Sequence, residues 1–154
     1  MDTKLPQFVT GKTCWRISKV PDFPTFLRNL PSLVPSGSIL CLEGTGAEDI
    51  EVYLSQRPAI YPNEVTQGFL SMRAKTYFMP VTLENLHGLA ELAEHHAEPE
   101  ICDHLRVYFN DKAVLAWHDI IDDPLDIDDQ IDESRIRAFT DELGTTYAGG
   151  VEPI

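Results

Sequence analysis

Hydrophobic and polar residues alternate most regularly between residues 103 and 119. Leu105, Val107 and Phe109 alternate with His104 and other more polar side chains, and a second alternating run follows the polar segment 110–112. Alternation with a period of two is typical of strands that bury one face, so this stretch predicts a β-hairpin.

The length of the hairpin loop decides which residues face each other. A three-residue loop pairs Leu105 with Trp117 and makes one face wholly apolar, and we prefer this register. It requires a left-handed conformation at Lys112, which Gly or Asn would accept more readily. A two-residue loop would slip the register by one and place Trp117 on the polar face. The preferred register sets His104 opposite His118 on the outer face.

Strand-like and helix-like patterns alternate along the rest of the chain. Segment 58–73 has no readable pattern, and residues 1–12 and 145–154 are predicted to be loose tails. Pro31 and Pro35 are expected to stop the first helix. The predicted strands are 14–20, 38–42, 74–81 and 125–127. The predicted helices begin near 22, 47, 83 and 132–134, and the one that begins at Leu83 is expected to run to about Ala97.

The order of these elements, β-α-β-α-β-α-β-β-α, predicts one domain over residues 1–154 in the α+β (mixed α/β) class. Strand–helix–strand units favour parallel pairs and the hairpin is antiparallel, so we expect a mixed sheet of about five strands with about four helices. We expect one helix layer and an outer face, bearing Arg106 and Tyr108, that is partly open to solvent. Aromatic and Arg side chains on such a face suit a protein contact.

Acidic residues far outnumber basic ones. The 154 residues include 25 Asp and Glu against 12 Lys and Arg, a formal net charge of −13, while 43% hydrophobic residues are ordinary for a globular protein. The basic residues are scattered singly, which disfavours nucleic acid and anionic membranes, because both need clustered Lys and Arg. If charge selects a partner, that partner is a basic protein; the alternative is that the acidity only keeps the protein in solution.

The sequence favours a cytoplasmic protein. The first residues lack the apolar core of a signal peptide, and no run approaches the ~20 apolar residues that span a bilayer. Cys14, Cys41 and Cys102 lie far apart, each in or beside an apolar run. We interpret them as buried, reduced thiols and not as a disulfide framework or metal knot.

The opposed histidines suggest a metal site. Facing residues of a hairpin have Cβ atoms ~4.5–5.5 Å apart, so His104 and His118 could share Zn²⁺ or Mn²⁺. A catalytic site needs a third ligand, and Asp122 or Asp123 is the candidate. The alternative is that both histidines are ordinary residues of an amphipathic face.

Other patterns are weaker. His87, Glu91 and His95 recur every four residues on one helix strip, which we interpret as a solvated face. The turn 44–46 lacks the third glycine of a dinucleotide fingerprint and a P-loop Lys. We find no nucleophile motif.

The acid-rich segment 119–133 suggests calcium, but an EF-hand loop beginning at Asp126 has Ile131 where Gly belongs and Arg137 where Glu belongs. We interpret the segment as a solvated loop. A looser calcium site and an acidic docking surface are alternatives, and Asp126, Asp128 and Asp129 are the candidate docking residues.

Three functions follow as hypotheses. The first is a non-catalytic, cytoplasmic interaction domain that binds a basic protein. The second is a metal-dependent hydrolase that uses His104, His118 and an aspartate, with the metal lowering the pKa of a water molecule. The third is a homodimer without small-molecule chemistry.

Overall fold

The structure, a computed structural model, describes residues 13–59 and 75–153. In these ranges, five helices accompany one seven-stranded sheet of order β3-β2-β4-β5-β6-β1-β7, which confirms the α+β class. The strands are β1 (Cys14–Ile17), β2 (Ile39–Glu43), β3 (Thr76–Pro80), β4 (His104–Phe109), β5 (Lys112–Trp117), β6 (Leu125–Asp128) and β7 (Ala148–Val151). The helices are α1 (Phe23–Leu33), α2 (Glu48–Ser55), α4 (Leu83–Ala93), α5 (Glu98–Ile101) and α6 (Glu133–Leu143).

The sheet is antiparallel throughout, where a mixed sheet was predicted. Every neighbouring pair of strands runs in opposite directions. The unit β1-α1-β2 does bring the chain back in the same direction, as strand–helix–strand patterns predict. However, β4, β5 and β6 lie between β1 and β2, so the two parallel strands are not hydrogen-bonded.

Helix α1 begins at a side-chain cap and continues through a proline. The Asp22 carboxylate accepts a hydrogen bond from the Thr25 backbone N–H at 3.0 Å. Pro31 was expected to stop the helix, but the helix runs to Leu33 and ends before Pro35. Pro31 removes only the hydrogen bond that its N–H would have donated to the Leu27 carbonyl, and the last residues of α1 follow it.

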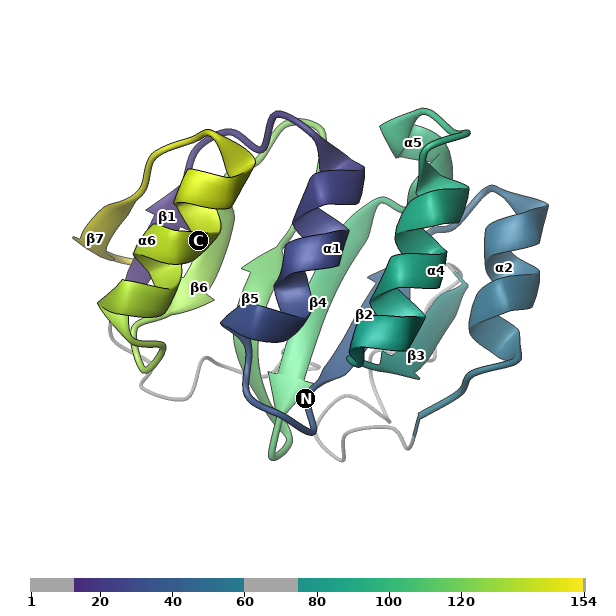
Figure 1. Ribbon diagram of the computed structural model, residues 1–154, viewed down its shortest axis with the longest axis horizontal. Helices are drawn as coiled ribbons and strands as arrows, with labels where there is room; N and C mark the ends of the chain where they lie inside the picture. The colour runs from purple at the N-terminus through teal and green to yellow at the C-terminus, as the bar shows by residue number, and fades with distance from the viewer. Residues whose placement is uncertain (1–12, 60–74, 154) are drawn as a thin grey trace, which may run out of the picture.

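All five helices cover one face of the sheet (Figure 1). The main core lies between these two layers, and it is richest in aromatic rings where α1 meets β5 and α6. Phe26 packs edge-on against Trp117 at 5.2 Å and against Phe139 at 5.8 Å. Phe23 lies 5.8 Å from Trp117. These contacts fix the position of α1 on the sheet.

The hairpin combines features of both predicted registers. Its turn has two residues, Asn110 and Asp111, with φ of 52° and 64°, so the predicted three-residue loop is wrong. A bulge at Val114 then restores the preferred pairing of Leu105 with Trp117. Asn and Asp tolerate the left-handed conformation better than Lys112 does.

The outer face of the sheet is not open at its centre. Tyr108 and Arg106 lie on that face as predicted, but only 1% and 4% of their surfaces are exposed, so the expectation of exposure is wrong. The physical reason is a second apolar cluster on this face, in which Tyr108 packs with Cys41 and Phe78. Arg106 and Tyr108 are therefore not surface residues available for a protein contact.

Two further expectations change at the C-terminal half. Residues 145–154 were predicted to be a loose tail, but β7 pairs with β1 inside that segment. Helix α4 ends at Ala93 and not at Ala97, and a short turn separates it from α5. The predictions for segments 1–12 and 60–74 lie outside the described residues. Within the described ranges, no helix has the length and hydrophobicity needed to cross a membrane.

Candidate functional site

The two histidines of the hairpin face each other as predicted. The ring centroids of His104 and His118 are 4.7 Å apart, and their planes differ by 19°. The neighbouring pair, Leu105 and Trp117, sets this register. His118 is exposed and His104 is half-buried, so the pair lies at the rim of the outer face.

His104 lies among charged groups. Glu43 of β2 is its cross-strand partner, and Glu43 Oε1 lies 3.7 Å from Arg106 Nη1. Burial lowers the pKa of His104; the charge of Glu43 opposes this shift, and His118 and Arg106 add to it. In the described part of the chain, His104 Nδ1 is buried without a hydrogen-bond partner. The lowered pKa and the unpartnered Nδ1 both favour the neutral form of His104.

The geometry around the pair does not form a metal chelate. Lone pairs of imidazole lie in the ring plane, so the nearly parallel rings of His104 and His118 direct them side by side instead of toward one point. The backbones of the two candidate third ligands are hydrogen-bonded within the chain after β5. The N–H of Asp122 donates to Asp119 Oδ1, and the Asp123 carbonyl accepts from Trp117 Nε1. Across residues 13–59 and 75–153, no three His, Cys, Asp or Glu side chains are grouped to hold a metal.

The middle of the acid-rich segment, Leu125–Asp128, is strand β6, so the prediction of a solvated loop is wrong for these residues. Asp126 and Asp128 belong to β6 and are 3% and 0% exposed. Asp126 makes a bidentate pair with Arg16 of β1, with N–O distances of 2.7 and 3.0 Å. Asp129 accepts a hydrogen bond from Thr13. Asp126 and Asp128 are thus not available as a docking surface.

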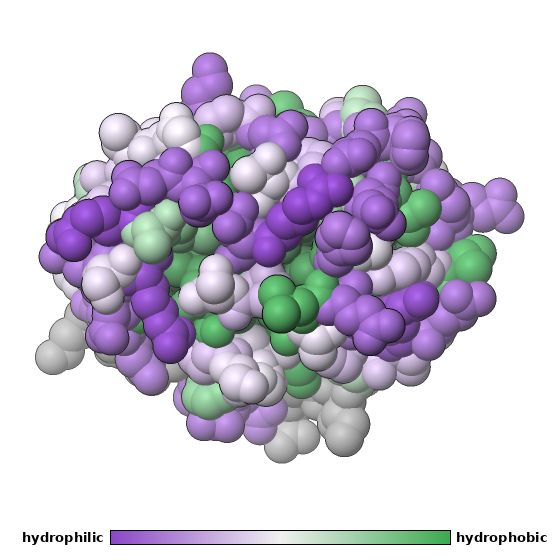
Figure 2. Space-filling view, viewed as in Figure 1, coloured by the Kyte–Doolittle hydropathy of each residue, from purple (hydrophilic) through white to green (hydrophobic). Residues whose placement is uncertain are grey.

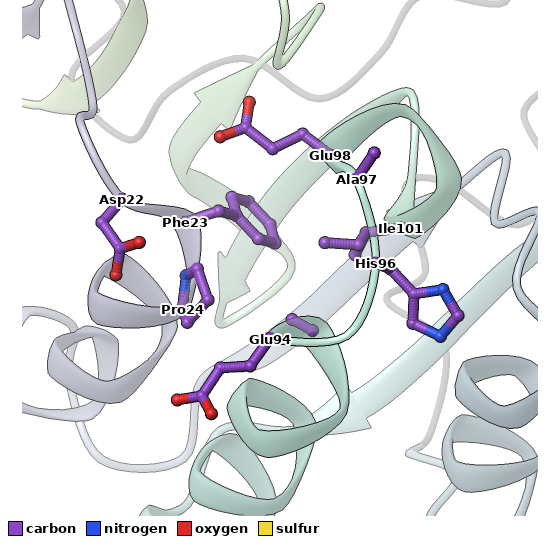
Figure 3. A pocket seen from close by; sticks show the side chains of 9 residues that line it. Asp22, Phe23, Pro24, Glu94, His96, Ala97, Glu98 and Ile101 are labelled. Atoms are coloured by element: carbon purple, nitrogen blue, oxygen red, sulfur yellow. The ribbon is translucent and has the colours of Figure 1, made fainter.

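A cavity of about 300 Å³ opens on the helix side, between the start of α1 and the α4–α5 junction (Figure 3). Its floor is apolar, and carboxylates stand around its rim. The residues that line it are Asp22, Phe23, Pro24, Ala93, Glu94, His96, Ala97, Glu98 and Ile101.

The two walls of the cavity are helix ends whose positions follow from local sequence features. On one side, Asp22 caps α1 and Pro24 occupies its first turn, a position where the missing N–H costs nothing. On the other side, α4 ends at Ala93, and α5 begins with Glu98 and a proline. Phe23, which lines the cavity, also packs against Trp117 of β5, with ring centroids 5.8 Å apart.

The three rim carboxylates differ in how they are compensated. Glu94 pairs with Arg28 at 2.5 Å, and Asp22 accepts hydrogen bonds from its own helix. Glu98 has no ion pair or hydrogen bond among the described residues. Burial raises the pKa of Glu98, and the negative charge of Asp22 raises it further. Two negative charges thus face the cavity, and the Glu98 charge has no cation beside it.

His96 stands behind the wall, with its ring turned away from the cavity (Figure 3). Its Nε2 lies 2.9 Å from Asp49 Oδ1 of α2, and its Nδ1 lies 3.0 Å from Glu100 Oε1 of α5. The hydrogen bonds to Asp49 and Glu100 raise the pKa of His96.

The sequence predictions did not identify this cavity. They gave no site role to Asp22, Glu94, Glu98 or His96. No local pattern connects them, because packing of α1 against α4 brings Asp22 to the α4–α5 junction.

Comparison with known proteins gives no further guidance, since no protein-family model, no curated protein and no solved structure matches the chain.

Proposed function

We propose that this protein is a non-catalytic interaction domain that binds a basic segment of another protein at the cavity between α1 and the α4–α5 junction. The observation that carries the proposal is the Glu98 carboxylate, which is partly buried beside Asp22 and has no cation among the described residues. A positive group that enters the cavity would therefore stabilise the ionised form of this carboxylate.

A lysine or arginine side chain fits the chemistry of the cavity. Its aliphatic stem would lie on the apolar floor at Pro24 and Ile101, and its charged head would lie between Asp22 and Glu98. The volume of about 300 Å³ is at the small end of ligand cavities. It therefore suits one anchoring side chain of a peptide.

The surroundings support a positively charged partner. Figure 2 shows the helix-covered face as mostly hydrophilic, with hydrophobic residues scattered and not joined in one patch. The formal net charge of −13 attracts a basic partner over distance and repels acidic ones. Charge would therefore contribute mainly to the association rate, and the cavity to the lifetime of the complex.

The cytoplasm is the compartment that we propose. Cys14, Cys41 and Cys102 are free and buried. Burial raises the pKa of both Cys14 and Cys41 to about 12, so these thiols remain protonated and unreactive at neutral pH. Free buried thiols are usual in a reducing compartment.

The test is binding of fluorescein-labelled, N-acetylated peptides that carry arginine among Gly and Ser, followed by fluorescence anisotropy. We expect Glu98→Gln to weaken binding about tenfold, since a charge-assisted contact contributes about 1.5 kcal/mol. Glu84→Gln removes the same charge from the first turn of α4, at the end of that helix away from the cavity, and is the matched control. Affinity that is equal in both variants, or independent of salt, would refute the proposal.

A metal-dependent hydrolase is a second candidate, and the contact between His104 and His118 is the observation that favours it. Metal binding would require the rings to rotate out of their parallel stack, with Asp122 or Asp123 as third ligand. Elemental analysis of protein purified without chelator tests this candidate. It predicts near-stoichiometric zinc or manganese that is lost in His118→Ala; metal-free protein would eliminate it.

A further inference from the structure

We infer that a proton on His96 holds one wall of the cavity in place, and that the docking site is therefore controlled by pH. The wall is the turn between α4 and α5, which carries Glu94 and Glu98. The consequence for binding rests on the proposed function, whereas the state of the wall does not.

The argument begins with the two hydrogen bonds of the His96 ring. Nε2 lies 2.9 Å from Asp49 Oδ1, and Nδ1 lies 3.0 Å from Glu100 Oε1. Ionised carboxylates only accept hydrogen bonds, so both ring nitrogens must donate. Imidazole carries two N–H groups only when it is positively charged. The arrangement therefore requires the imidazolium form, and a neutral ring would turn a lone pair toward one of the carboxylates.

The charges that face His96 all favour its proton. They are Asp49 from α2 and Glu100 from α5, and hydrogen bonds to these two groups raise the pKa of His96 above its ordinary value of 6.5. The same contact lowers the pKa of Asp49. The bridge is thus complete in mildly acidic solution and is lost as the pH rises through the raised pKa of His96.

The bridge matters for the wall because few other polar contacts join the turn to neighbouring elements. The backbone hydrogen bonds of the turn are local, from His95 to Leu92 and from His96 to Ala93. Its polar contacts with neighbouring elements are the Arg28–Glu94 pair, the hydrogen bond from the Gly46 N–H to the Glu100 carbonyl, and the His96 side chain. Ala93 and Ile101, on either side of the turn, are buried in the core, so the segment between them is held mainly by these polar contacts. Of these, only the His96 contact depends on pH near neutrality.

Loss of the proton has two effects on a bound cation. It makes the charge around the cavity more negative, which favours binding. It also breaks the hydrogen-bonded bridge that holds the α4–α5 turn in place, which weakens binding. The His96 ring points away from the cavity (Figure 3), and salt at 0.15 M weakens the effect of its exposed charge on a bound cation. The mechanical effect therefore dominates, and affinity falls as the pH rises.

The first measurement is an NMR titration of the free protein from pH 6.0 to 8.5. We expect both nitrogens of His96 to be protonated above pH 6.5, and the backbone amide signals of residues 94–98 to move with the same midpoint. In His96→Gln these movements disappear. In His95→Gln, which removes an exposed histidine from the same turn, they persist.

The second measurement is the affinity of the acetylated arginine peptide over the same range, in which its charge is constant. We expect the wild type and His95→Gln to bind about threefold more weakly at pH 8.5 than at pH 6.0 at 0.15 M salt, and His96→Gln to show no change. Equal pH profiles for wild type and His96→Gln, or an ordinary pKa for His96, would overturn the inference. If His96 and residues 94–98 titrate as expected but the peptide does not bind at any pH, the proposed function is refuted and the inference about the wall stands.

Discussion

Gly88 lies in the middle of α4, where glycine normally weakens a helix. An alanine in an exposed helix interior is favoured by about 1 kcal/mol over glycine. At this position, however, an added Cβ would lie 2.2 Å from the Tyr53 hydroxyl oxygen and 2.8 Å from its Cζ. Tyr53 comes from α2, and the close approach of the two helices therefore requires the absence of a side chain at Gly88.

The cost of Gly88→Ala follows from how firmly Tyr53 is held. Its hydroxyl donates to the Asn85 carbonyl at 2.8 Å, and the Arg57 guanidinium lies 3.8 Å from its ring centroid. Overpacking costs about 1–3 kcal/mol, and displacing the ring loses a hydrogen bond of about 1 kcal/mol. After the gain in helix propensity, we expect the free energy of unfolding to fall by about 1–3 kcal/mol.

The decisive comparison is made in a second background. In Tyr53→Ala the clash is gone, so Gly88→Ala should raise the free energy of unfolding by up to about 1 kcal/mol. Urea titration of all four proteins measures both effects, and each kcal/mol should also shift the melting temperature by about 2–4 °C. The same sign in both backgrounds would refute the contact between Tyr53 and Gly88 as the reason for glycine here.

Two further predictions concern charged groups of the sheet. Arg16→Met should lower the free energy of unfolding by about 2–4 kcal/mol in urea titration, because it leaves the buried Asp126 carboxylate without its bidentate partner. Arg28→Met breaks a more exposed pair and should cost less than about 1 kcal/mol; equal losses would contradict the first estimate. The lowered pKa of His104 means that the folded protein binds fewer protons than the unfolded chain, so this residue lowers stability as the pH falls below 6.5. In His104→Asn the loss between pH 7.5 and pH 5.5 should be smaller than in the wild type, and parallel urea midpoints would contradict this.

The sequence predicts the faces of the hairpin better than its turn. Alternation alone assigns Leu105 and Trp117 to the core and His104 and His118 to the other face, and the structure confirms this arrangement. A two-residue turn is compatible with this pairing only because of the bulge at Val114, and the residue types of the strand do not reveal a bulge. Because Val114 is apolar and buried in the main core, no polar residue in the sequence marks the extra position.

Whether a side chain is exposed was harder to predict than the face of the sheet to which it points. Arg106 and Asp126 point to the outer face, where the pattern places polar residues, yet both are buried beside partners from other strands, Glu43 and Arg16. Such pairs depend on strand order, and local periodicity carries no information about which strands become neighbours. The cavity was missed for the same reason, because its acidic groups come from the start of α1 and from the α4–α5 junction, which are distant in sequence.

The position of β1 constrains the order in which the molecule can be completed. Within the described residues, β1 pairs with β6 and β7, and its ion pair joins residues that are 110 positions apart. At about 5–20 residues per second, a ribosome needs on the order of ten seconds to supply those partners. During that interval Cys14 and Ile17, both fully buried in the final fold, have no strand to cover them. An incomplete chain therefore exposes a sheet-forming segment, and it is at that stage of synthesis that this protein is most open to mispairing with other chains.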